Sequence, residues 1–208
     1  MSKCIIFGAA EFDSLRFPIE EGDLLIAADG GLSHFARLNR NPDVILGDFD
    51  SLGYVPEGAR VFPVEKDDTD VMLAIRHGLS ARFREFHIYG GMEGKRLDHT
   101  VANLQALAFL RSQGARGYLL GKNQIATVIE KETLIFDGKE GILSVFCVGV
   151  PARGVTIRGM QYEMEKGDLT ADFPLGVSNH FIGKKAEISA ESGALLLIWD
   201  TPNLPEIL

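Results

Sequence analysis

The first 120 residues of the chain alternate short apolar runs with segments of helical periodicity, and this alternation is the strongest constraint on its fold. Most of the apolar runs end in Gly or Asp, as strands do where a turn follows. The strands expected on this pattern are 4–8, 24–29, 44–48, 60–65, 86–91 and 117–121. Strand–helix alternation is typical of an open, parallel sheet that is covered by helices.

Two helices are expected between these strands. The segment 69–82 places Val71 and Ile75 on one face, and the segment 98–113 repeats apolar residues at helical spacing. Gly114 follows the second segment and is a suitable residue to end a helix. We therefore expect an α/β fold, with a Rossmann-like, open and mostly parallel sheet in the N-terminal part of the chain.

The pattern changes after Lys122, where helical periodicity gives way to short β-type runs separated by turn residues. The expected strands are 126–130, 133–137, 142–149, 154–159, 186–190 and 194–199. Such a series of short strands is typical of a small all-β sandwich. We therefore expect an α/β domain over 1–123 and a β-sandwich domain over 124–208.

Composition narrows the possible functions. The chain has a formal net charge of −8, whereas nucleic-acid binders usually carry a basic patch. It contains no apolar run of the roughly 20 residues that a membrane span needs, and its N-terminus lacks the pattern of a signal peptide. Cys4 and Cys147 both stand in apolar runs, which favours reduced, buried thiols. We expect a cytoplasmic protein that binds neither nucleic acid nor membrane.

The sharpest motif is Gly47-Asp48-Phe49-Asp50-Ser51, directly after the apolar run 44–46. In an open α/β sheet, ligands bind at the carboxyl ends of the strands, where Asp48 and Asp50 are expected. Magnesium prefers carboxylate ligands and keeps open positions for water and phosphate oxygens. The alternative is that either aspartate serves only an Asx-turn or a helix cap.

Acidic residues recur at two other strand ends. Asp29 is followed by Gly30 and Gly31, and the acids of 67–70 precede the first expected helix. Acids at the start of a helix can serve as caps, so this second group has a purely structural alternative. Clustered carboxylates would repel one another, and a bound cation resolves that conflict. The sequence therefore indicates a divalent metal site at the strand ends.

A glycine-rich segment, 90–103, follows the strand at 86–91. Glycines between a strand and a helix can bind phosphate through backbone N–H groups. Lys95 and Arg96 add positive charge, and Arg can bind phosphate oxygens through two hydrogen bonds. The segment is neither a Walker A loop nor a GxGxxG fingerprint, and Asp98 could be a simple helix cap.

Together, the GDFDS motif, the DDTD segment before a helix and the RLDHTVANL segment resemble the thiamine pyrophosphokinase family of the bacterial type. The AADGG segment supports the resemblance, which covers nearly the whole chain. The segments 159–162 and 177–179 look like two local signatures of that family's second domain. Two departures are Lys95, where a glycine is common, and Tyr162, where tryptophan is common.

The resemblance implies an enzyme that converts thiamine and ATP into thiamine diphosphate and AMP with Mg²⁺. It also implies a homodimer in which thiamine lies between the α/β domain of one subunit and the β domain of the other. Carried onto this chain, the resemblance implies Asp48, Asp50 and Asp70 as metal ligands and Asp29 and Asp98 as acids of the cleft, and it matches Asn103, Tyr162, Ser178 and Asn179 to further family positions. With the charges needed at a polyphosphate, we expect the catalytic residues to be Asp70, Asp98 and Arg96. We expect the substrate-binding residues to be Asp29, Gly30, Asp48, Ser51, Lys66, Asn103, Tyr162, Ser178 and Asn179, with Lys66 chosen from its position alone.

Other functions remain open on these motifs. A pyrophosphokinase acting on another hydroxyl acceptor, such as a pterin, would need the same acids. A metal-dependent nucleotide-sugar transferase also places Asp-x-Asp after a strand. A phosphatase of the haloacid-dehalogenase type places its Asp-x-Asp on the first strand, whereas Asp48 follows the third expected strand. A nucleotide-binding module without catalysis would not need all of these acids.

Overall fold

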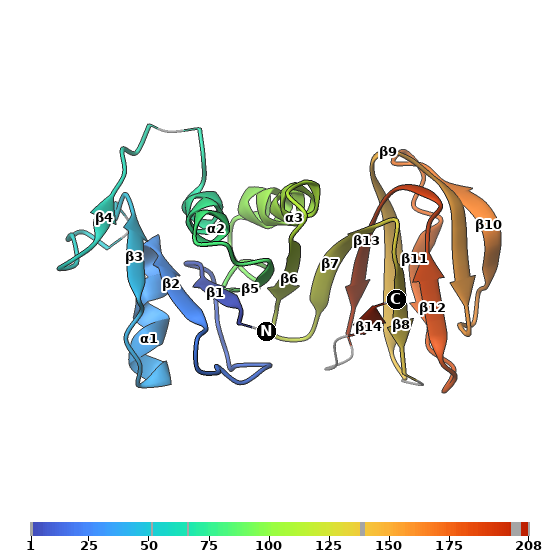
Figure 1. The fold of residues 1–208 in the computed structure, drawn as a ribbon, viewed down its shortest axis with the longest axis horizontal. Coiled ribbons are helices and arrows are strands. Elements are labelled where there is room, and N and C mark those ends of the chain that lie inside the picture. The colour runs from blue at the N-terminus through green and yellow to red at the C-terminus, as the bar shows by residue number, and fades with distance from the viewer. Residues whose placement is uncertain (1, 51, 66, 138–139, 201–204, 208) are drawn as a thin grey trace. The chain divides into compact units, whose positions relative to one another are not determined.

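The computed structural model describes residues 2–50, 52–65, 67–137, 140–200 and 205–207, and the chain forms two compact units (Figure 1). Unit 1 comprises Met1–Lys122, and unit 2 comprises Asn123–Leu208. In the described residues, no helix is both long enough and apolar enough to cross a membrane.

Unit 1 contains a sheet in which every pair of neighbouring strands is parallel. Its strands are β1 (Cys4–Phe7), β2 (Leu24–Ala28), β3 (Val44–Gly47), β4 (Arg60–Val61), β5 (Glu85–Tyr89) and β6 (Arg116–Leu120), in the order β4-β3-β2-β1-β5-β6. The expected parallel pairing is therefore present. The order reverses between β1 and β5, and ligands of open α/β sheets bind at such a reversal.

The helical segments of unit 1 connect these strands. They are η1 (Asp29–Leu32), α1 (Ser33–Leu38), α2 (Asp70–Ser80) and α3 (Leu97–Ser112). The helices expected at 69–82 and 98–113 are confirmed within two residues at each end, whereas η1 and α1 were not predicted. Figure 1 shows α2 and α3 next to each other beside the strands. Thr69 caps α2, because its hydroxyl accepts a hydrogen bond from the backbone N–H of Met72 (3.2 Å).

Side chains from the two sides of the sheet pack into separate layers of the core. On the side of α2, a Cβ atom at Gly78 would lie 2.6 Å from the Phe86 ring and 2.7 Å from the Cys4 sulfur, so the helix lies directly on these strands. The Phe7 side chain points to the opposite side, since residues alternate along a strand. There its ring packs 5.0 Å from Phe35 of α1 and 5.4 Å from Tyr89.

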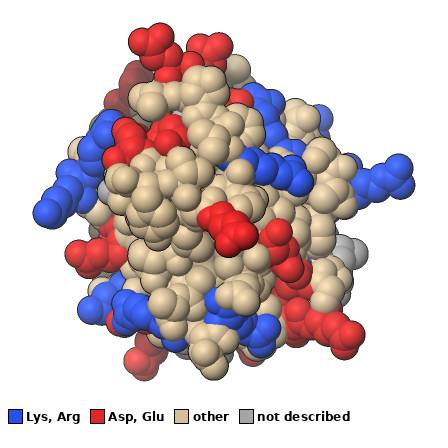
Figure 2. Space-filling model, turned by 90° about the vertical axis from the view of Figure 1, so that its left-hand side faces the viewer, with Lys and Arg blue, Asp and Glu red and all other residues tan. Residues whose placement is uncertain are grey.

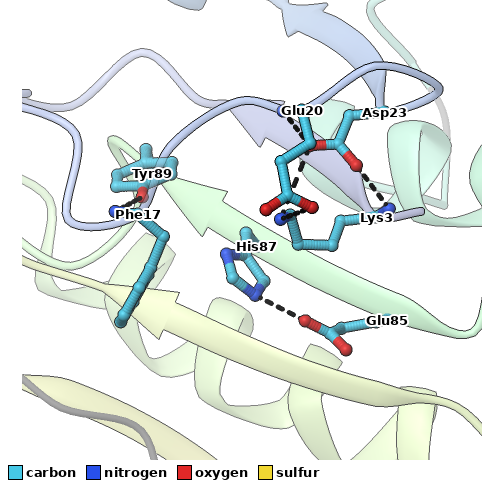
Figure 3. A network of polar contacts seen from close by, with 7 residues as sticks. All are labelled: Lys3, Phe17, Glu20, Asp23, Glu85, His87 and Tyr89. Atoms are coloured by element: carbon cyan, nitrogen blue, oxygen red, sulfur yellow. Dashed lines mark hydrogen bonds and ion pairs between the residues drawn. The ribbon is translucent and has the colours of Figure 1, made fainter. Parts of the chain in front are cut away.

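A polar network holds the start of β1 (Figure 3). The Asp23 carboxylate accepts hydrogen bonds from the backbone N–H groups of Lys3 (2.8 Å) and Glu20 (2.9 Å). The Lys3 ammonium group lies 3.6 Å from Asp23 and 3.4 Å from Glu20. These contacts fix the end of the loop that connects β1 with β2, and they satisfy the charge of the nearly buried Lys3.

The second pair in Figure 3 joins two residues of β5. The Nε2–H of the buried His87 donates to a carboxylate oxygen of Glu85 at 2.9 Å. The His87 ring also lies edge-on to Phe17 (5.4 Å) and Tyr118 (5.6 Å). The hydrogen bond from His87 lowers the pKa of Glu85 below its usual value. The pair therefore favours an ionised carboxylate in the folded state.

The described residues of unit 2 form strands and turns. Its strands are β7 (Ile125–Glu130), β8 (Thr133–Phe136), β9 (Ile142–Arg158), β10 (Met164–Leu169), β11 (Gly176–His180), β12 (Ala186–Ser189), β13 (Ser192–Trp199) and β14 (Glu206–Ile207). They pair antiparallel in the order β14-β8-β12-β9-β13-β7, and β10 and β11 also pair with β9.

The long strand β9 organises unit 2. Its first half pairs with β13 and β11, and its second half pairs with β12 and β10. The sequence predicted two strands, 142–149 and 154–159, where the structure has one, because the register irregularity opposite Ser192 and Ala194 lets the strand continue past Pro151. A core of aromatic rings lies within the unit, where Phe136 packs 5.3 Å from Trp199 and 5.4 Å from Phe181.

We expect Glu85→Gln to destabilise the protein more at pH 7 than in acid. The folded-state pKa of Glu85 is lowered, so its stabilising contribution is complete above its unfolded pKa of about 4.5 and is lost as the pH falls through the lower folded value. Urea unfolding of both proteins at about pH 7 and about pH 3.5 measures the difference. The exposed Glu57→Gln is the control. An equal difference at both pH values would contradict the prediction.

Candidate active site

Three carboxylates gather at the carboxyl ends of β2 and β3. Asp29 follows β2, and Asp48 and Asp50 follow β3. The two strands pair in parallel, with Ala28 opposite Leu46, and this register places both strand ends at the same edge. One oxygen atom from each of Asp29, Asp48 and Asp50 lies within 4.8 Å of the others. We call these three residues the acid cluster.

The backbone around the acid cluster allows the ends of β2 and β3 to lie close together. A Cβ atom at Gly47 would lie 3.0 Å from the Cα of Asp29, so a larger residue would push the two strand ends apart. Phe49 has a φ of 59°, an unusual conformation for a bulky residue, and its ring is buried. Phe49 is turned inward, while one carboxylate oxygen from each of its neighbours Asp48 and Asp50 belongs to the acid cluster. The backbone N–H of Asp50 also donates to a carboxylate oxygen of Asp48 (3.3 Å).

Asp29 shares the left-handed conformation of Phe49, with a φ of 49°. Such residues cost on the order of 1–3 kcal/mol each and concentrate at functional sites. Two of them in one cluster, on adjacent strand ends, indicate that the fold maintains this arrangement at the expense of stability. The two conformations support a function for the acid cluster beyond turn formation.

The donor set of the acid cluster fits a divalent cation. Two carboxylates about 5 Å apart repel each other by roughly 1–3 kcal/mol, depending on screening. Asp29 is buried, so its charge is poorly solvated, while Asp48 is half-buried and Asp50 is exposed. Oxygen ligands of this kind, open to solvent on one side, are what Mg²⁺ uses when it binds a polyphosphate.

The cluster differs from the expected metal set in one member. Within the described part of the chain, the group that could hold an ion is Asp29, Asp48 and Asp50, and it does not include Asp70. Asp70 is the first residue of α2, and its neighbour Val71 packs against the end of β1 at Gly8. Asp68, beside it, is paired with Arg76 at 2.7 Å. Asp70 therefore starts a helix near the strand ends, outside the three-residue group.

The glycine-rich segment after β5 is held by two side chains of α3. The amide of the buried Asn103 donates to the carbonyl of Gly91 (2.8 Å), and the Thr100 hydroxyl donates to that of Met92 (3.0 Å). Gly90 has a φ of 61°, and a Cβ atom there would lie 2.4 Å from the Gly8 carbonyl. Asn103, expected to bind substrate, thus uses its amide to fix the turn between β5 and α3.

Arg96 and Asp98 form an exposed ion pair at the start of α3. The guanidinium donates two hydrogen bonds to the carboxylate, at 2.5 Å and 3.1 Å. This pairing raises the pKa of Arg96 and lowers the pKa of Asp98 to about 2. Arg96 therefore carries a positive charge next to the glycine-rich segment, and Asp98 is fully ionised at neutral pH.

The remaining expected residues of unit 1 are placed as follows. Gly30 lies in η1, where its carbonyl accepts a hydrogen bond from the Ser33 hydroxyl (2.8 Å). Ser51 and Lys66 lie outside the described residues. Figure 2 shows one face of the molecule, on which the described acidic and basic side chains are interspersed among neutral residues.

A cavity of about 500 Å³ opens in unit 1, and no sequence motif predicted it. Its wall is formed by Glu11, Phe12, Asp13, Ser33, His34, Arg37, Glu93 and Lys122. His34 contacts the Ala10 carbonyl (2.9 Å), and Arg37 donates to the Phe12 carbonyl (2.9 Å). Burial lowers the pKa of His34, which favours its neutral form. The lining residues are scattered along the chain, and α1 was not expected, so the sequence offered no signal for this cavity.

Unit 2 places the expected residue Tyr162 on a turn and the expected residues Ser178 and Asn179 on the adjoining strand β11. The Tyr162 ring is 63% exposed, whereas Asn179 is buried. The Asn179 side chain exchanges two hydrogen bonds with the backbone of Tyr162, at 3.0 and 2.7 Å. Ser178 is exposed, with a φ of 59°, and its N–H donates to the Ser144 hydroxyl (3.1 Å). An exposed aromatic ring on a fixed backbone is suited to stacking on a flat ligand.

Comparisons with known proteins give matches to the same family for both units. A family model described as thiamin pyrophosphokinase, catalytic domain, matches residues 18–119, and one described as thiamin pyrophosphokinase, vitamin B1 binding domain, matches residues 128–195. The thiamine pyrophosphokinase of Bacillus subtilis (strain 168) is 26% identical over 192 residues, covering 88% of this chain and 89% of that protein.

Solved structures show the same fold. The crystal structure of thiamine pyrophosphokinase from Bacillus subtilis superposes with a TM-score of 0.83 at 22% identity, covering 97% of this chain and 99% of the other. The thiamin pyrophosphokinase from Candida albicans gives a TM-score of 0.75 at 14% identity, covering 96% and 90%. The fold is therefore retained at low sequence identity.

We expect Asp48→Asn and Asp50→Asn to weaken divalent cation binding by about tenfold or more, because each removes a charged ligand from the acid cluster. Titration with Mn²⁺, followed by electron paramagnetic resonance, measures the affinity without any nucleotide. Asp68→Asn is the matched control, since this carboxylate is already paired with Arg76. Asp70→Asn tests the remaining expected ligand. Unchanged affinity in both cluster variants would contradict the metal assignment.

Proposed function

The chain belongs to the thiamin pyrophosphokinase family, and we propose that it uses ATP and Mg²⁺ to convert thiamine into thiamine diphosphate, releasing AMP. The catalytic and vitamin-binding regions of the family both lie in this chain, one in each unit. Its function is therefore that of a pyrophosphate-transferring enzyme with thiamine as acceptor. The dependence on ATP and on the metal, and the roles of single residues, are our proposal.

The acid cluster is the single observation that carries the ATP and metal proposal. Asp29, Asp48 and Asp50 offer oxygen ligands within 4.8 Å of one another beside the strand ends. Mg²⁺ held there would neutralise negative charge on the polyphosphate as the bond to AMP breaks. A protein with a net charge of −8 needs such a bridge to bind a polyanion. Asp70, at the start of α2, completes the proposed metal site or binds through a water.

Arg96 provides the second neutralising charge. It lies beside the glycine-rich segment, and its partner Asp98 is equally exposed, so the pair is accessible to an incoming phosphate. An exposed ion pair contributes only about 0–1 kcal/mol, whereas hydrogen bonds between Arg and phosphate are charge-assisted and can be paired. We propose that Arg96 exchanges Asp98 for phosphate oxygens when the nucleotide binds.

The acceptor hydroxyl must lose its proton during the transfer. Asp98 is a weak base while Arg96 holds its pKa near 2, and it becomes a better acceptor once Arg96 has moved to the phosphates. Asp70 is the alternative acceptor. Since transfer of this type relies mainly on positioning and charge neutralisation, we assign Asp70, Asp98 and Arg96 supporting roles and assign the main charge compensation to the acid cluster.

The cavity of unit 1 is suited to the adenosine half of ATP. Its volume of about 500 Å³ lies within the usual 300–1,000 Å³ of small-molecule sites. Ser33 and Glu93 of its wall follow closely on Gly31 and Gly91, so the cavity opens beside the strand ends that carry the acid cluster. Nucleotides bind at this end of a Rossmann-like sheet, which is how we interpret unit 1.

Unit 2, which we interpret as a β-sandwich, would supply the face for thiamine. The exposed ring of Tyr162 can stack on the vitamin, and the thiazolium charge favours an aromatic neighbour. Ser178 lies on the adjoining strand β11. We further propose a homodimer with the active site at the subunit interface; the exposed apolar side chains of Phe173, Leu175 and Val177 offer contact area for it. A cytoplasmic location remains our prediction from the sequence.

Asp48→Ala and Asp50→Ala should reduce turnover by a factor of at least about 100 without unfolding the protein, because the metal could no longer be held on the polyphosphate. The assay incubates protein, ATP, Mg²⁺ and thiamine and detects AMP and thiamine diphosphate together. Asp68→Ala is the control. Near-normal activity in either cluster variant would refute the metal role. Formation of AMP only with a pterin acceptor would redirect the assignment.

Ser33→Phe should raise the KM for ATP several-fold while the KM for thiamine stays within about twofold, because the new ring would occupy the cavity. Ala36→Phe, at an exposed position of the same helix outside the cavity wall, is the matched control. Steady-state kinetics with each substrate varied in turn make the comparison. If Ser33→Phe leaves the KM for ATP unchanged, adenosine binds elsewhere.

A further inference from the structure

The turn 159–162 and the segment 178–181, which comprises the end of β11 and Phe181, are joined by backbone contacts in unit 2. Met160 forms an antiparallel bridge with Phe181, and the N–H of Gln161 donates to the carbonyl of His180 (2.9 Å). The next residue along, Tyr162, has no strand partner in the described structure, and its backbone is bound instead by the Asn179 side chain. We call this arrangement the Asn179 clip.

The clip uses most of the hydrogen-bonding capacity of Asn179. Its Oδ1 accepts from the N–H of Tyr162 (3.0 Å) and from the N–H of His180 (2.9 Å), which occupies both lone pairs. Its Nδ2 donates to the carbonyl of Tyr162 (2.7 Å). The opposite orientation of the amide would turn NH₂ toward two N–H donors, so the network fixes which atom is which.

Burial keeps the Asn179 side chain away from a ligand outside the unit. It also makes the clip a strong constraint on the backbone of Tyr162. Asn179 is 4% exposed, so its one remaining N–H has little access to a molecule outside. The Tyr162 ring, in contrast, is 63% exposed, although its backbone is held at both its N–H and its carbonyl. Outside the backbone, Tyr162 has a long hydrogen bond from the exposed Gln161 amide to its hydroxyl (3.4 Å). The backbone is therefore fixed before a ligand binds, which lowers the entropy lost when the ring orders against that ligand.

We propose that Asn179 is a positioning residue, which acts on thiamine through Tyr162 and not by direct contact. This proposal rests on the proposed function, because it takes the Tyr162 ring as the surface that stacks on the vitamin. It departs from the expectation that Asn179 is itself a substrate-binding residue. A variant without the Asn179 amide still has the Tyr162 ring. Its backbone at Tyr162 is no longer fixed, so the ring is not held in its binding position.

A double-mutant cycle separates the two roles. Thiamine affinity is measured by isothermal titration calorimetry for wild-type, Tyr162→Ala, Asn179→Ala and the double variant. Stacking of this kind is worth about 0.5–1.5 kcal/mol, so Tyr162→Ala should weaken binding by roughly 2- to 12-fold. Asn179→Ala should cost no more than that, and the double variant should bind like Tyr162→Ala alone, within about twofold. If the two losses multiply, Asn179 contacts thiamine directly and the proposal is overturned.

Two further variants and the KM for ATP test whether the result of the cycle reflects positioning or a general structural defect. Asn179→Asp retains both acceptor contacts, so it replaces the alanine variant in the same cycle if that variant does not fold. His180→Ala is the matched control on β11, because His180 takes part in the clip only through its backbone. The KM for ATP should stay within about twofold in every variant; a parallel rise in both KM values would mean a general structural defect and would overturn the positioning role.

Failure of the proposed function gives a different pattern. If the wild-type chain binds no thiamine and forms no thiamine diphosphate, the function itself is wrong. If the wild-type chain is active but Tyr162→Ala binds thiamine normally, the ring is not the stacking surface and the positioning role of Asn179 falls with it. Normal binding by Asn179→Ala in an active enzyme, with Tyr162→Ala impaired, overturns the positioning role alone.

Discussion

The mutual repulsion of Asp29, Asp48 and Asp50 is the constraint on which the active end of unit 1 depends. Nothing in a parallel sheet requires three acids within 4.8 Å, and the chain maintains them there with two left-handed residues and a glycine at the closest approach. Each of these features costs stability. A protein whose surface is already acidic would gain nothing from adding charge repulsion at one point. The arrangement is understandable if its purpose is to bind a cation, and the cation in turn lets the protein bind a polyphosphate.

Two buried asparagines serve the same physical purpose in the two units. The amide of Asn103 donates a hydrogen bond to the Gly91 carbonyl, and the amide of Asn179 forms two hydrogen bonds with the backbone of Tyr162. In both cases a buried side chain replaces the strand or helix partner that a turn lacks, so that the turn holds its shape while its outer side stays open. A sequence motif that contains such an asparagine is therefore easily interpreted as a ligand contact, although the structure shows its side chain bound to the backbone of a neighbouring segment.

The sequence predicted those parts of the fold and site that depend on local patterns. The parallel strands and the convergence of Asp48 and Asp50 follow from apolar runs that end in Gly or Asp, and α2 and α3 follow from apolar residues at helical spacing. The short helix α1 and the polar strand β10 were not predicted, because neither shows a continuous apolar pattern and both depend on tertiary contacts. The cavity was not predicted for a related reason. Its wall combines a loop, a short helix and residues 93 and 122, which only the fold brings together. Asp29 lies in the cluster because the parallel register of β2 and β3 brings these two strand ends together, which the sequence pattern did not specify.

The exposed pair of Arg96 and Asp98 shows how a weak interaction can be useful. At 69% and 63% exposure, the side chains lose little when they separate, because water replaces each partner. A buried pair would hold Arg96 more firmly and would make its transfer to phosphate costly. In the proposed complex the exchange also changes Asp98, whose pKa is low only while Arg96 is its partner. The carboxylate would then gain basicity only after the nucleotide has bound, so that the capacity to accept a proton depends on the presence of the group to be transferred.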